Sequence, residues 1–343
     1  MTAPSHWFSP GRHADRRPLL LARNRIVAAV RSWFADKGFF EVDCAALAVS
    51  PGNEAHLHAF ATEMILPDGS RQRRYLHTSP EFAAKKLLAA GETHIFNLGH
   101  VWRNRERTAT HSPEFTMLEW YRVREDYEAV IADTLALIQL AAATAGTKVF
   151  QWRGREADPF APAEWLTVND AFKAHAGVDL LSTIRSDGTA DGEALARLSP
   201  VAFGKDESWS DIFSRILSEK VEPQLGNGRV TVLYEYPAVE AALARTTAHD
   251  HRVAERFEIY ACGVELANGF GELTDPDEQR RRFVAEMDVK EQVHGERYPI
   301  DEDLLAALAI MPPASGVALG LDRLVMLAAG ATHIDQVLWT PVV

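Results

Sequence analysis

Two cysteines in 343 residues are too few and too far apart for a disulfide framework or a metal cluster. Cys44 and Cys262 belong to no C-x-x-C pair, which is typical of a protein kept in the reducing cytoplasm. No segment approaches the ~18 uninterrupted apolar residues of a membrane-spanning helix. The apolar run "PLLLA" at 18–22 is too short for a secretory signal. We therefore expect a cytoplasmic protein with no membrane partner.

Basic residues are also scarce, and phosphate-binding glycine loops are missing. The chain has 36 Lys and Arg against 48 Asp and Glu, a net charge of -12. This balance argues against a broad nucleic-acid-binding surface, so tRNA is not expected as a partner. The chain contains neither a G-x-G-x-x-G nor a Walker sequence, so arginine side chains would have to hold any nucleotide.

Apolar periodicity and turn residues divide the chain into helices and paired strands. Residues 1–17 are expected to be flexible and residues 18–343 to form the folded domain, in which 150–230 is hardest to interpret beyond two short helices. The pattern predicts helices at 19–37, 79–91, 126–145 and 276–294, strands at 39–43, 94–103, 114–123 and 229–236, and a hairpin at 255–273. A short strand followed by a helix is expected within 312–330. Because strands fall in adjacent pairs, we expect an α+β fold with a mainly antiparallel sheet flanked by helices.

The stretch "FNLGHVWRNRERTATHSPEFTMLEWYR" at 96–122 sets alternating arginines before an apolar strand. Arg103, Arg105 and Arg107 repel one another unless carboxylates or an anionic ligand compensate their charge. Two interpretations are open: a surface hairpin whose arginines pair with nearby carboxylates, or a phosphate site.

Three other segments allow a structural or a functional interpretation. In "VALGLDRLVML", Gly320 and Arg323 suit either a tight strand-to-helix turn or a nucleotide pocket. In "GVELANGFGEL", Glu265 and Glu272 suit either a solvated hairpin or, if a bulge brings them to one face, a Mg²⁺ site. The segment "TSPE" at 78–81 suits either a helix start or an ammonium site. Arginines for phosphate, paired carboxylates for Mg²⁺ and others for an ammonium together describe activation of an amino acid by ATP.

These segments resemble the signature motifs of class II aminoacyl-tRNA synthetases. The helix and "KGFFEVD" at 27–43 resemble motif 1, the dimer-forming segment; "HSPEFTMLEWY" resembles motif 2 and "GVALGLDRLVML" motif 3. "TSPE" and "ELANGFGEL" are similar to the lysyl branch, and "EFTMLEWYR", "HRVAERFEIY" and "SGVALGLDRLVML" to the elongation factor P lysine lysyltransferase family. The resemblance covers nearly the whole chain and is weakest at 150–230. It implies a homodimer of class II catalytic domains without an anticodon-binding domain, because motif 1 begins near the start of the chain.

The resemblance also implies roles for individual residues. Arg103 would bind the ATP α-phosphate and Arg323 the γ-phosphate, and Glu265 would reach ATP through Mg²⁺; these three are the expected catalytic residues. The other residues expected to bind ATP are Asn104, Arg105, Glu106, Ser112, Phe115 (on adenine), Leu266 and Gly320. The amino-acid substrate is expected to contact Ser79, Pro80, Glu81, Glu119, Tyr121 and Glu272, with Glu272 shared with the metal.

Two positions depart from the family pattern. Arg105 stands where a glutamate often follows the asparagine, and we hypothesise that Glu106 takes its role. Ser112 stands where asparagine is common, and it offers one donor instead of two.

The implied reaction is the ATP-dependent activation of (R)-β-lysine, or lysine, to an aminoacyl-adenylate and its transfer to a lysine ε-amine of elongation factor P. Two alternatives stay open: a truncated lysyl-tRNA synthetase-like enzyme acting on RNA or another amine, and a non-catalytic regulatory paralogue.

Overall fold

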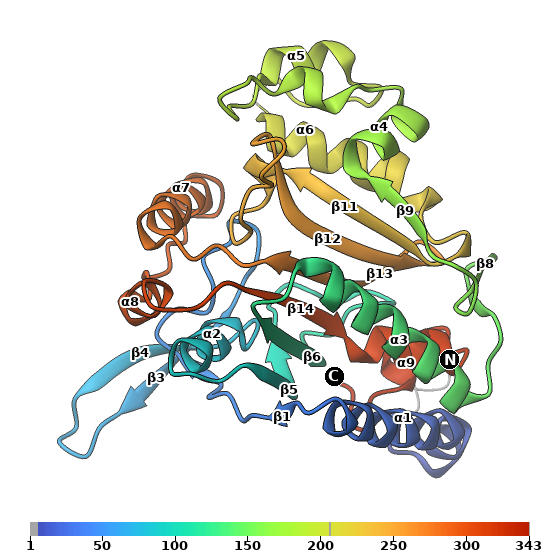
Figure 1. The fold of residues 1–343 in the computed structure, drawn as a ribbon. Helices are drawn as coiled ribbons and strands as arrows, with labels where there is room; N and C mark the ends of the chain where they lie inside the picture. The colour runs from blue at the N-terminus through green and yellow to red at the C-terminus, as the bar shows by residue number, and fades with distance from the viewer. Residues whose placement is uncertain (1–5, 206, 343) are drawn as a thin grey trace.

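The computed structural model describes residues 6–205 and 207–342, which are built on an eight-stranded sheet with the order β1-β5-β6-β14-β13-β12-β11-β9 (Figure 1). Its strands are β1 (Phe40–Glu41), β5 (His94–Trp102), β6 (Glu114–Val123), β9 (Glu164–Thr167), β11 (Thr231–Pro237), β12 (Val253–Ala261), β13 (Val264–Gly271) and β14 (Ala314–Gly320). The edge pairs β1–β5 and β9–β11 are parallel, and every pair between them is antiparallel. The expected mainly antiparallel sheet is confirmed.

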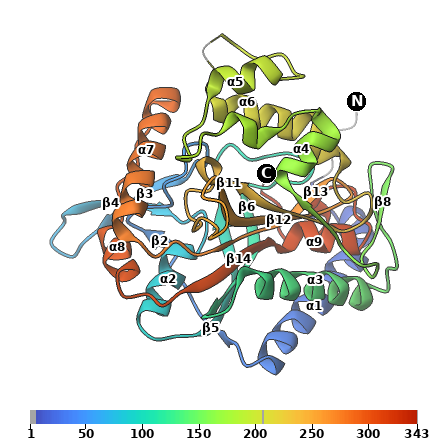
Figure 2. The ribbon, with the colours of Figure 1, turned by 45° about the horizontal axis from the view of Figure 1, so that its top comes forward.

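Two smaller sheets lie beside the large one. One consists of β2 (Leu47–Ala48), β3 (Phe60–Ile65) and β4 (Arg71–Leu76), and the other of β7 (Phe150–Trp152), β8 (Arg155–Asp158) and β10 (Gly228–Arg229). The β3–β4 hairpin projects from the body of the molecule in both ribbon views (Figure 2).

Helices cover the sheet in separate groups. They are α1 (Pro10–Asp36), α2 (Glu81–Ala89), α3 (Tyr127–Ala145), α4 (Val168–Ala176), α5 (Gly192–Leu198), α6 (Trp209–Ile216), α7 (Pro276–His294), α8 (Glu302–Leu308) and α9 (Leu321–Ala328). Short helical turns lie at Leu180–Thr183, Leu217–Val221, Glu222–Gln224, Ala238–Glu240 and Ile334–Gln336. α1, α3 and α9 lie at one side of the molecule, whereas α4, α5 and α6 form a separate group beyond β11 and β12.

The hydrophobic core is divided in the same way. The largest cluster joins α1, α3 and α9 to the sheet through residues such as Phe34, Trp120 and Leu319. A second cluster around Phe172 and Phe213 packs α4 and α6 against β11. The described part of the segment 150–230, for which two short helices were predicted, contains α4, α5 and α6, short strands and most of the second cluster.

The N-terminal prediction was wrong for residues 10–17, which are helical and not loose. α1 begins at Pro10 and runs through Pro18. The polar sequence is misleading because Arg16 is buried and donates to the carbonyl of Leu338. Further along α1, Arg23 pairs with Asp322 at 2.9 Å. The rest of the predicted flexible segment includes residues 1–5, which lie outside the described residues.

One described helix, α3, is long and apolar enough to cross a membrane by length and composition alone. Its buried residues, including Val130, Leu137 and Ile138, belong to the largest core cluster. Packing against α1 and the sheet accounts for this apolar composition.

Candidate active site

A cavity on the sheet collects most of the site residues predicted from the sequence. They come from the start of α2, the ends of β5 and β6, β13, and the β14–α9 junction. The predicted residues that line it are Ser79, Glu81, Arg103, Phe115, Glu119, Tyr121, Glu265, Leu266, Glu272, Gly320 and Arg323. Segments far apart in the chain thus meet at one place.

A bulge in β13 brings Glu265 and Glu272, the residue just after this strand, to the same cavity. Glu265 and Glu272 are an odd number of residues apart, so a regular strand would put them on opposite faces. Tyr260 of β12 pairs with Glu265, but Ile259 pairs with Ala267, which leaves Leu266 as the extra residue. A one-residue bulge reverses the facing of everything beyond it. The bulge anticipated from the glycines therefore exists, but it lies at Leu266.

One end of the cavity is a buried group of charges. Lys85 is 1% exposed, and its Nζ lies 2.5 Å from an Oε1 of Glu81 and 2.6 Å from an Oε2 of Glu272. Burial by itself would lower the pKa of Lys85, but the charges of Glu272 and Glu81 outweigh it and raise that pKa. Burial raises the pKa of Glu272 to about 7, against the opposing charge of Lys85 and together with that of Glu81. Lys85 thus stays charged between the two carboxylates.

Glu119 provides a third carboxylate at this end. The hydroxyls of Ser79 and Tyr121 each donate to it, at 2.6 Å. Burial, reinforced by the charges of Glu81 and Glu272, raises the pKa of Glu119 to about 8. Three carboxyl groups therefore gather at this end of the cavity, and Lys85 is the cation fixed between two of them.

The segment "TSPE" begins a helix, as one interpretation of its sequence predicted, and it also reaches the cavity. Pro80 is the N-cap of α2, and the Ser79 hydroxyl accepts a hydrogen bond from the backbone N–H of Glu81 at 3.0 Å. The same helix start directs Ser79 and Glu81 into the cavity. Pro80 lies between them and does not line the cavity itself.

Arginines lie at the other end. Arg103 donates from Nε to the carbonyl of Thr78 at 3.2 Å, and its guanidinium lies 5.4 Å from the centre of the Phe115 ring. Its two terminal nitrogens form no hydrogen bond with a described residue. They are free to bind an anion in the cavity.

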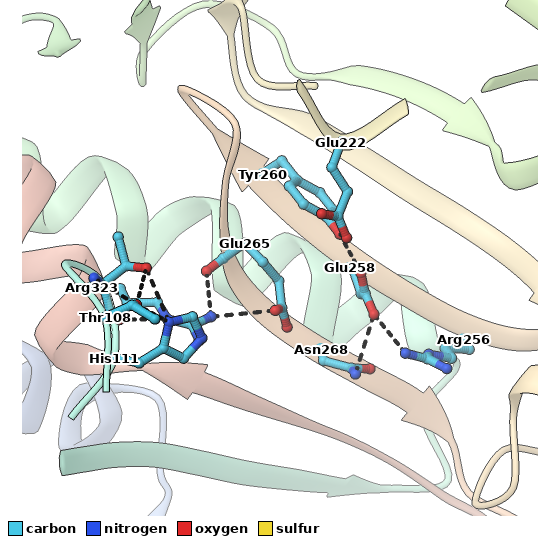
Figure 3. A network of polar contacts seen from close by, with 10 residues as sticks. Thr108, His111, Glu222, Arg256, Glu258, Tyr260, Glu265, Asn268 and Arg323 are labelled. Atoms are coloured by element: carbon cyan, nitrogen blue, oxygen red, sulfur yellow. Dashed lines mark hydrogen bonds and ion pairs between the residues drawn. The ribbon is translucent and has the colours of Figure 1, made fainter. Parts of the chain in front are cut away.

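Arg323 is the second arginine of the cavity, and Glu265 and His111 hold it in place (Figure 3). It donates to the carbonyl of Glu265 at 2.9 Å and lies 3.3 Å from an Oε2 of the same residue. It also contacts the Nε2 of His111 at 2.6 Å. Burial and the charges of Arg323 and Arg103 lower the pKa of His111 to about 4, so this ring is neutral and accepts from Arg323.

The remaining arginines of the 96–122 stretch turn away from the cavity. Arg105, at φ 67°, pairs with Glu296 at 2.9 Å, and Arg107 lies 3.5 Å from Asp335. The carboxylate-pairing interpretation thus holds for these two, whereas Arg103 is placed for the anion interpretation. Asn104 bridges to His58 through its backbone and does not line the cavity.

A small neighbouring cavity contains two of the other residues expected to bind ATP. Glu106 and Ser112 line it together with Phe115, Gly320 and Arg323. Ser112 is fully buried, and its hydroxyl has no partner among the described residues. Glu106 therefore approaches Phe115, as the hypothesis about its role requires, while Arg105 at the motif position points elsewhere.

The carboxylates fit a Mg²⁺ ion held mainly by a nucleotide. The described residues contain no group of three His, Cys, Asp or Glu side chains arranged for a metal. Glu265 and Glu272 nevertheless line the same cavity as the two arginines, and Mg²⁺ usually takes only one or two carboxylates besides substrate phosphates. The site suits an ion that arrives with its phosphate ligands.

Several residues at the site were missed in the sequence. The sequence gives no sign of Lys85, because its position suggests an exposed helix face and only the fold buries it. His111 lies within the motif 2 segment, but its contact with Arg323 depends on the fold. Glu258, which pairs with Arg256 at 2.6 Å, and Glu222 lie beside Glu265 (Figure 3). Burial and the charges of Glu258 and Glu265 raise the pKa of Glu222 to about 7.

The comparison with protein families matches the class II tRNA synthetases (D, K and N) over residues 6–343. The chain belongs to this family. Its fold, in which motifs 2 and 3 meet in one cavity, is that of a class II synthetase catalytic domain.

Individual relatives of this chain share one name within the family. The chain is 41% identical over 322 residues to the elongation factor P--(R)-beta-lysine ligase of Haemophilus ducreyi, covering 93% of this chain and 92% of that protein. It is 40% identical over 340 residues to the Haemophilus influenzae protein of the same name, covering 98% of both. The match to the Klebsiella pneumoniae protein of that name is 41% over 324 residues, 94% of both. The resemblance predicted from the sequence is confirmed.

Proposed function

We propose that this chain is an ATP-dependent ligase that activates (R)-β-lysine, or lysine, and transfers it to a lysine ε-amine of elongation factor P. The observation that carries this proposal is the cavity with Arg103 and Arg323 at one end and Glu81, Glu119 and Glu272 at the other. A lysine isomer has one carboxylate to react and two ammonium groups to bind. The cavity offers matching charges at both ends.

In the first step, a carboxylate oxygen of the amino acid attacks the α-phosphorus of ATP. The bond from that phosphorus to the bridging oxygen breaks, and pyrophosphate leaves with the electron pair. The terminal nitrogens of Arg103 stabilise the charge that develops on the α-phosphate. Arg323, oriented by His111 and Glu265, binds the γ-phosphate, and Phe115 stacks on adenine once Arg103 moves from its ring.

The chain's carboxylates orient the substrate. Glu81 and Glu119 receive the two ammonium groups, and Lys85 keeps Glu272 in place beside them. Glu265 and Glu272 are the carboxylates that would hold a Mg²⁺ ion, which would supply positive charge to the phosphates of ATP. Glu106 and Ser112 hold the adenine side of the nucleotide.

We further propose that the chain is a cytoplasmic homodimer joined through residues 27–43. Phe40 of the edge strand β1 is 68% exposed, which is unusual for a large apolar side chain and suits a covered interface. Cys44 and Cys262 are both free thiols, in keeping with a reducing compartment. The net charge of -12 suits a protein acceptor better than tRNA.

The test is the mass of elongation factor P after incubation with the enzyme, ATP, Mg²⁺ and either (R)-β-lysine or lysine. We expect a gain of one lysyl unit, larger for the preferred isomer. The gain should be lost in Arg323→Ala and kept in the matched control Arg107→Ala, whose arginine pairs with Asp335 away from the cavity. Pyrophosphate release without a mass gain would indicate another acceptor, such as tRNA, and neither signal would indicate a non-catalytic paralogue.

A further inference from the structure

A second cavity of about 580 Å³ adjoins the candidate active site. Both cavities are lined by Glu54, Leu57, Leu243, Asn268 and Phe270, so they share a boundary. The second one continues outward between α6, α7 and the loop that carries Glu54. Its volume is in the range of ligand-binding pockets. Because it adjoins the candidate active site, a second substrate could reach the activated amino acid through it.

The walls of the second cavity are acidic. Its carboxylates are Glu54, Asp211, Glu240 and Glu286. The arginine in its wall, Arg256, is already paired with Glu258 at 2.6 Å. A cavity of this charge attracts a cation, and the acceptor lysine of the proposed reaction arrives as an ammonium ion.

The loop that carries Glu54 is fixed at several points. The hydroxyl of Thr78 donates to the carbonyl of Pro51 at 2.6 Å, ahead of Glu54. Beyond it, Glu286 accepts from the backbone N–H of Ala55 at 2.8 Å, and Lys290 donates to the carbonyl of Ala55 at 3.0 Å. Glu54 is thus held at the boundary between the two cavities.

The carboxylate of Glu54 has no assigned partner. It forms no hydrogen bond or ion pair with a described residue, and the charged groups that face it are Arg103, Glu81, Arg256 and Glu286. The Glu54 side chain is exposed within the opening of the two cavities, so a substrate group can reach it. An unpaired carboxylate within reach of a substrate ammonium group can accept a proton from it.

The other carboxylates of the site are already engaged. Glu81 and Glu272 contact Lys85, Glu119 accepts from two hydroxyls, and Glu265 contacts Arg323. They also lie on the side assigned to the amino acid and the nucleotide. Among the described residues, Glu54 alone combines a free carboxylate with a place in the walls of both cavities.

We propose that the second cavity admits the acceptor lysine and that Glu54 takes the proton from its ammonium group. The freed nitrogen lone pair attacks the carbonyl carbon of the aminoacyl-adenylate. The bond from that carbon to the phosphate oxygen breaks, AMP leaves with its electron pair, and the nitrogen loses its second proton to solvent as the amide forms. This inference rests on the proposed function and supplies the transfer step with a base.

The experiment separates activation from transfer in Glu54→Gln, which keeps the size of the side chain. Amino-acid-dependent exchange of pyrophosphate into ATP reports activation. Single-turnover transfer from preformed adenylate to elongation factor P reports the second step, and hydroxylamine, already neutral near pH 7, serves as an acceptor that needs no base. Glu286→Gln keeps the acceptor for Ala55 while removing a charge from the cavity, and Glu63→Gln on exposed β3 is the remote control.

We expect Glu54→Gln to keep normal exchange and normal reaction with hydroxylamine, while transfer to elongation factor P falls about 100- to 10,000-fold. Glu286→Gln should weaken acceptor binding without changing the maximal transfer rate, and Glu63→Gln should change neither. If Glu54→Gln transferred the amino acid to elongation factor P at the wild-type rate, the inference would be overturned. It would also be overturned if Glu54→Gln lost pyrophosphate exchange together with transfer. Absence of transfer in the wild-type enzyme would instead overturn the proposed function itself.

Discussion

Lys85 determines the charge balance of the carboxylate end, although no chemistry is assigned to it. It is fully enclosed and contacts Glu81 and Glu272 at once. Removing the Lys85 charge would leave the buried negative charges of Glu81 and Glu272 uncompensated. We expect Lys85→Met to lower the free energy of unfolding by about 3–5 kcal/mol, measured by urea denaturation at neutral pH.

Lys86 is the matched control, because it is partly exposed and pairs with Asp301 at 2.7 Å. Lys86→Met should cost less than about 1 kcal/mol. Lys85→Arg should be more stable than Lys85→Met but less stable than the wild type, because it keeps the charge in a bulkier group. Equal unfolding midpoints for Lys85→Met and Lys86→Met would show that the buried contacts carry no net stabilisation.

In the proposed function Glu119 receives a substrate ammonium group, which makes substrate binding depend on pH. Its pKa is raised to about 8, so the free enzyme carries a proton there at pH 7. An ammonium ligand favours the ionised carboxylate, so binding must release that proton. Amino-acid affinity should therefore weaken as the pH falls below about 8, by up to about tenfold per pH unit.

Isothermal titration in buffers of different ionisation enthalpy measures this proton directly. We expect close to one proton released per lysine bound at pH 7, and none in Glu119→Gln. An equal release from the variant would assign the proton to another group, such as Glu272.

Among single residues, the motif positions could be read from the sequence, whereas their neighbours could not. Arg103, Glu265 and Arg323 stand out because their segments have recognisable patterns. Lys85, His111 and Glu54 acquire significance only through contacts with residues that are distant in the chain. Arg105 shows the reverse, because it occupies a motif position yet pairs with Glu296 outside the cavity.

At the scale of elements, local turn chemistry explains which predictions succeeded. The helix predicted at 276–294 is found at those bounds, because Asp275 caps its start and Gly295 ends it in the left-handed conformation. The hairpin joint at Cys262 and Gly263 has positive φ at both residues, as a tight two-residue turn requires. The bulge at Leu266 and the core of 150–230 depend on strand register and tertiary packing, which no local signal specifies.

Strand β14 passes so close to the carboxylate end that only glycine fits at Gly316. A Cβ there would lie within 3.0 Å of both Tyr121 and Glu272. We expect Gly316→Ala to raise KM for the amino acid by at least about tenfold, equivalent to about 1.4 kcal/mol, with KM for ATP unchanged. Gly11→Ala, where nothing lies within 4 Å, is the control. An increase in both KM values with a lower melting temperature would instead indicate general disruption of the sheet.

At the scale of the whole molecule, strand β5 connects the exposed edge of the large sheet to the candidate active site. β1 pairs with β5, and the side chain of Asn97 on β5 donates to the carbonyl of Val42 at 2.7 Å. β5 then ends beside Arg103. A partner covering β1 would therefore hold both the sheet edge and the strand that places this arginine.

This arrangement predicts that Phe40→Asp separates the proposed homodimer. A charge at the centre of an apolar interface carries a desolvation cost that the single protomer avoids. Light scattering coupled to gel filtration should give twice the chain mass for the wild type and a single chain mass for the variant. Ile310→Asp, which alters another exposed apolar side chain just after α8, should remain dimeric. A monomeric wild type would refute the dimer, whereas a dimeric Phe40→Asp would place the interface away from β1.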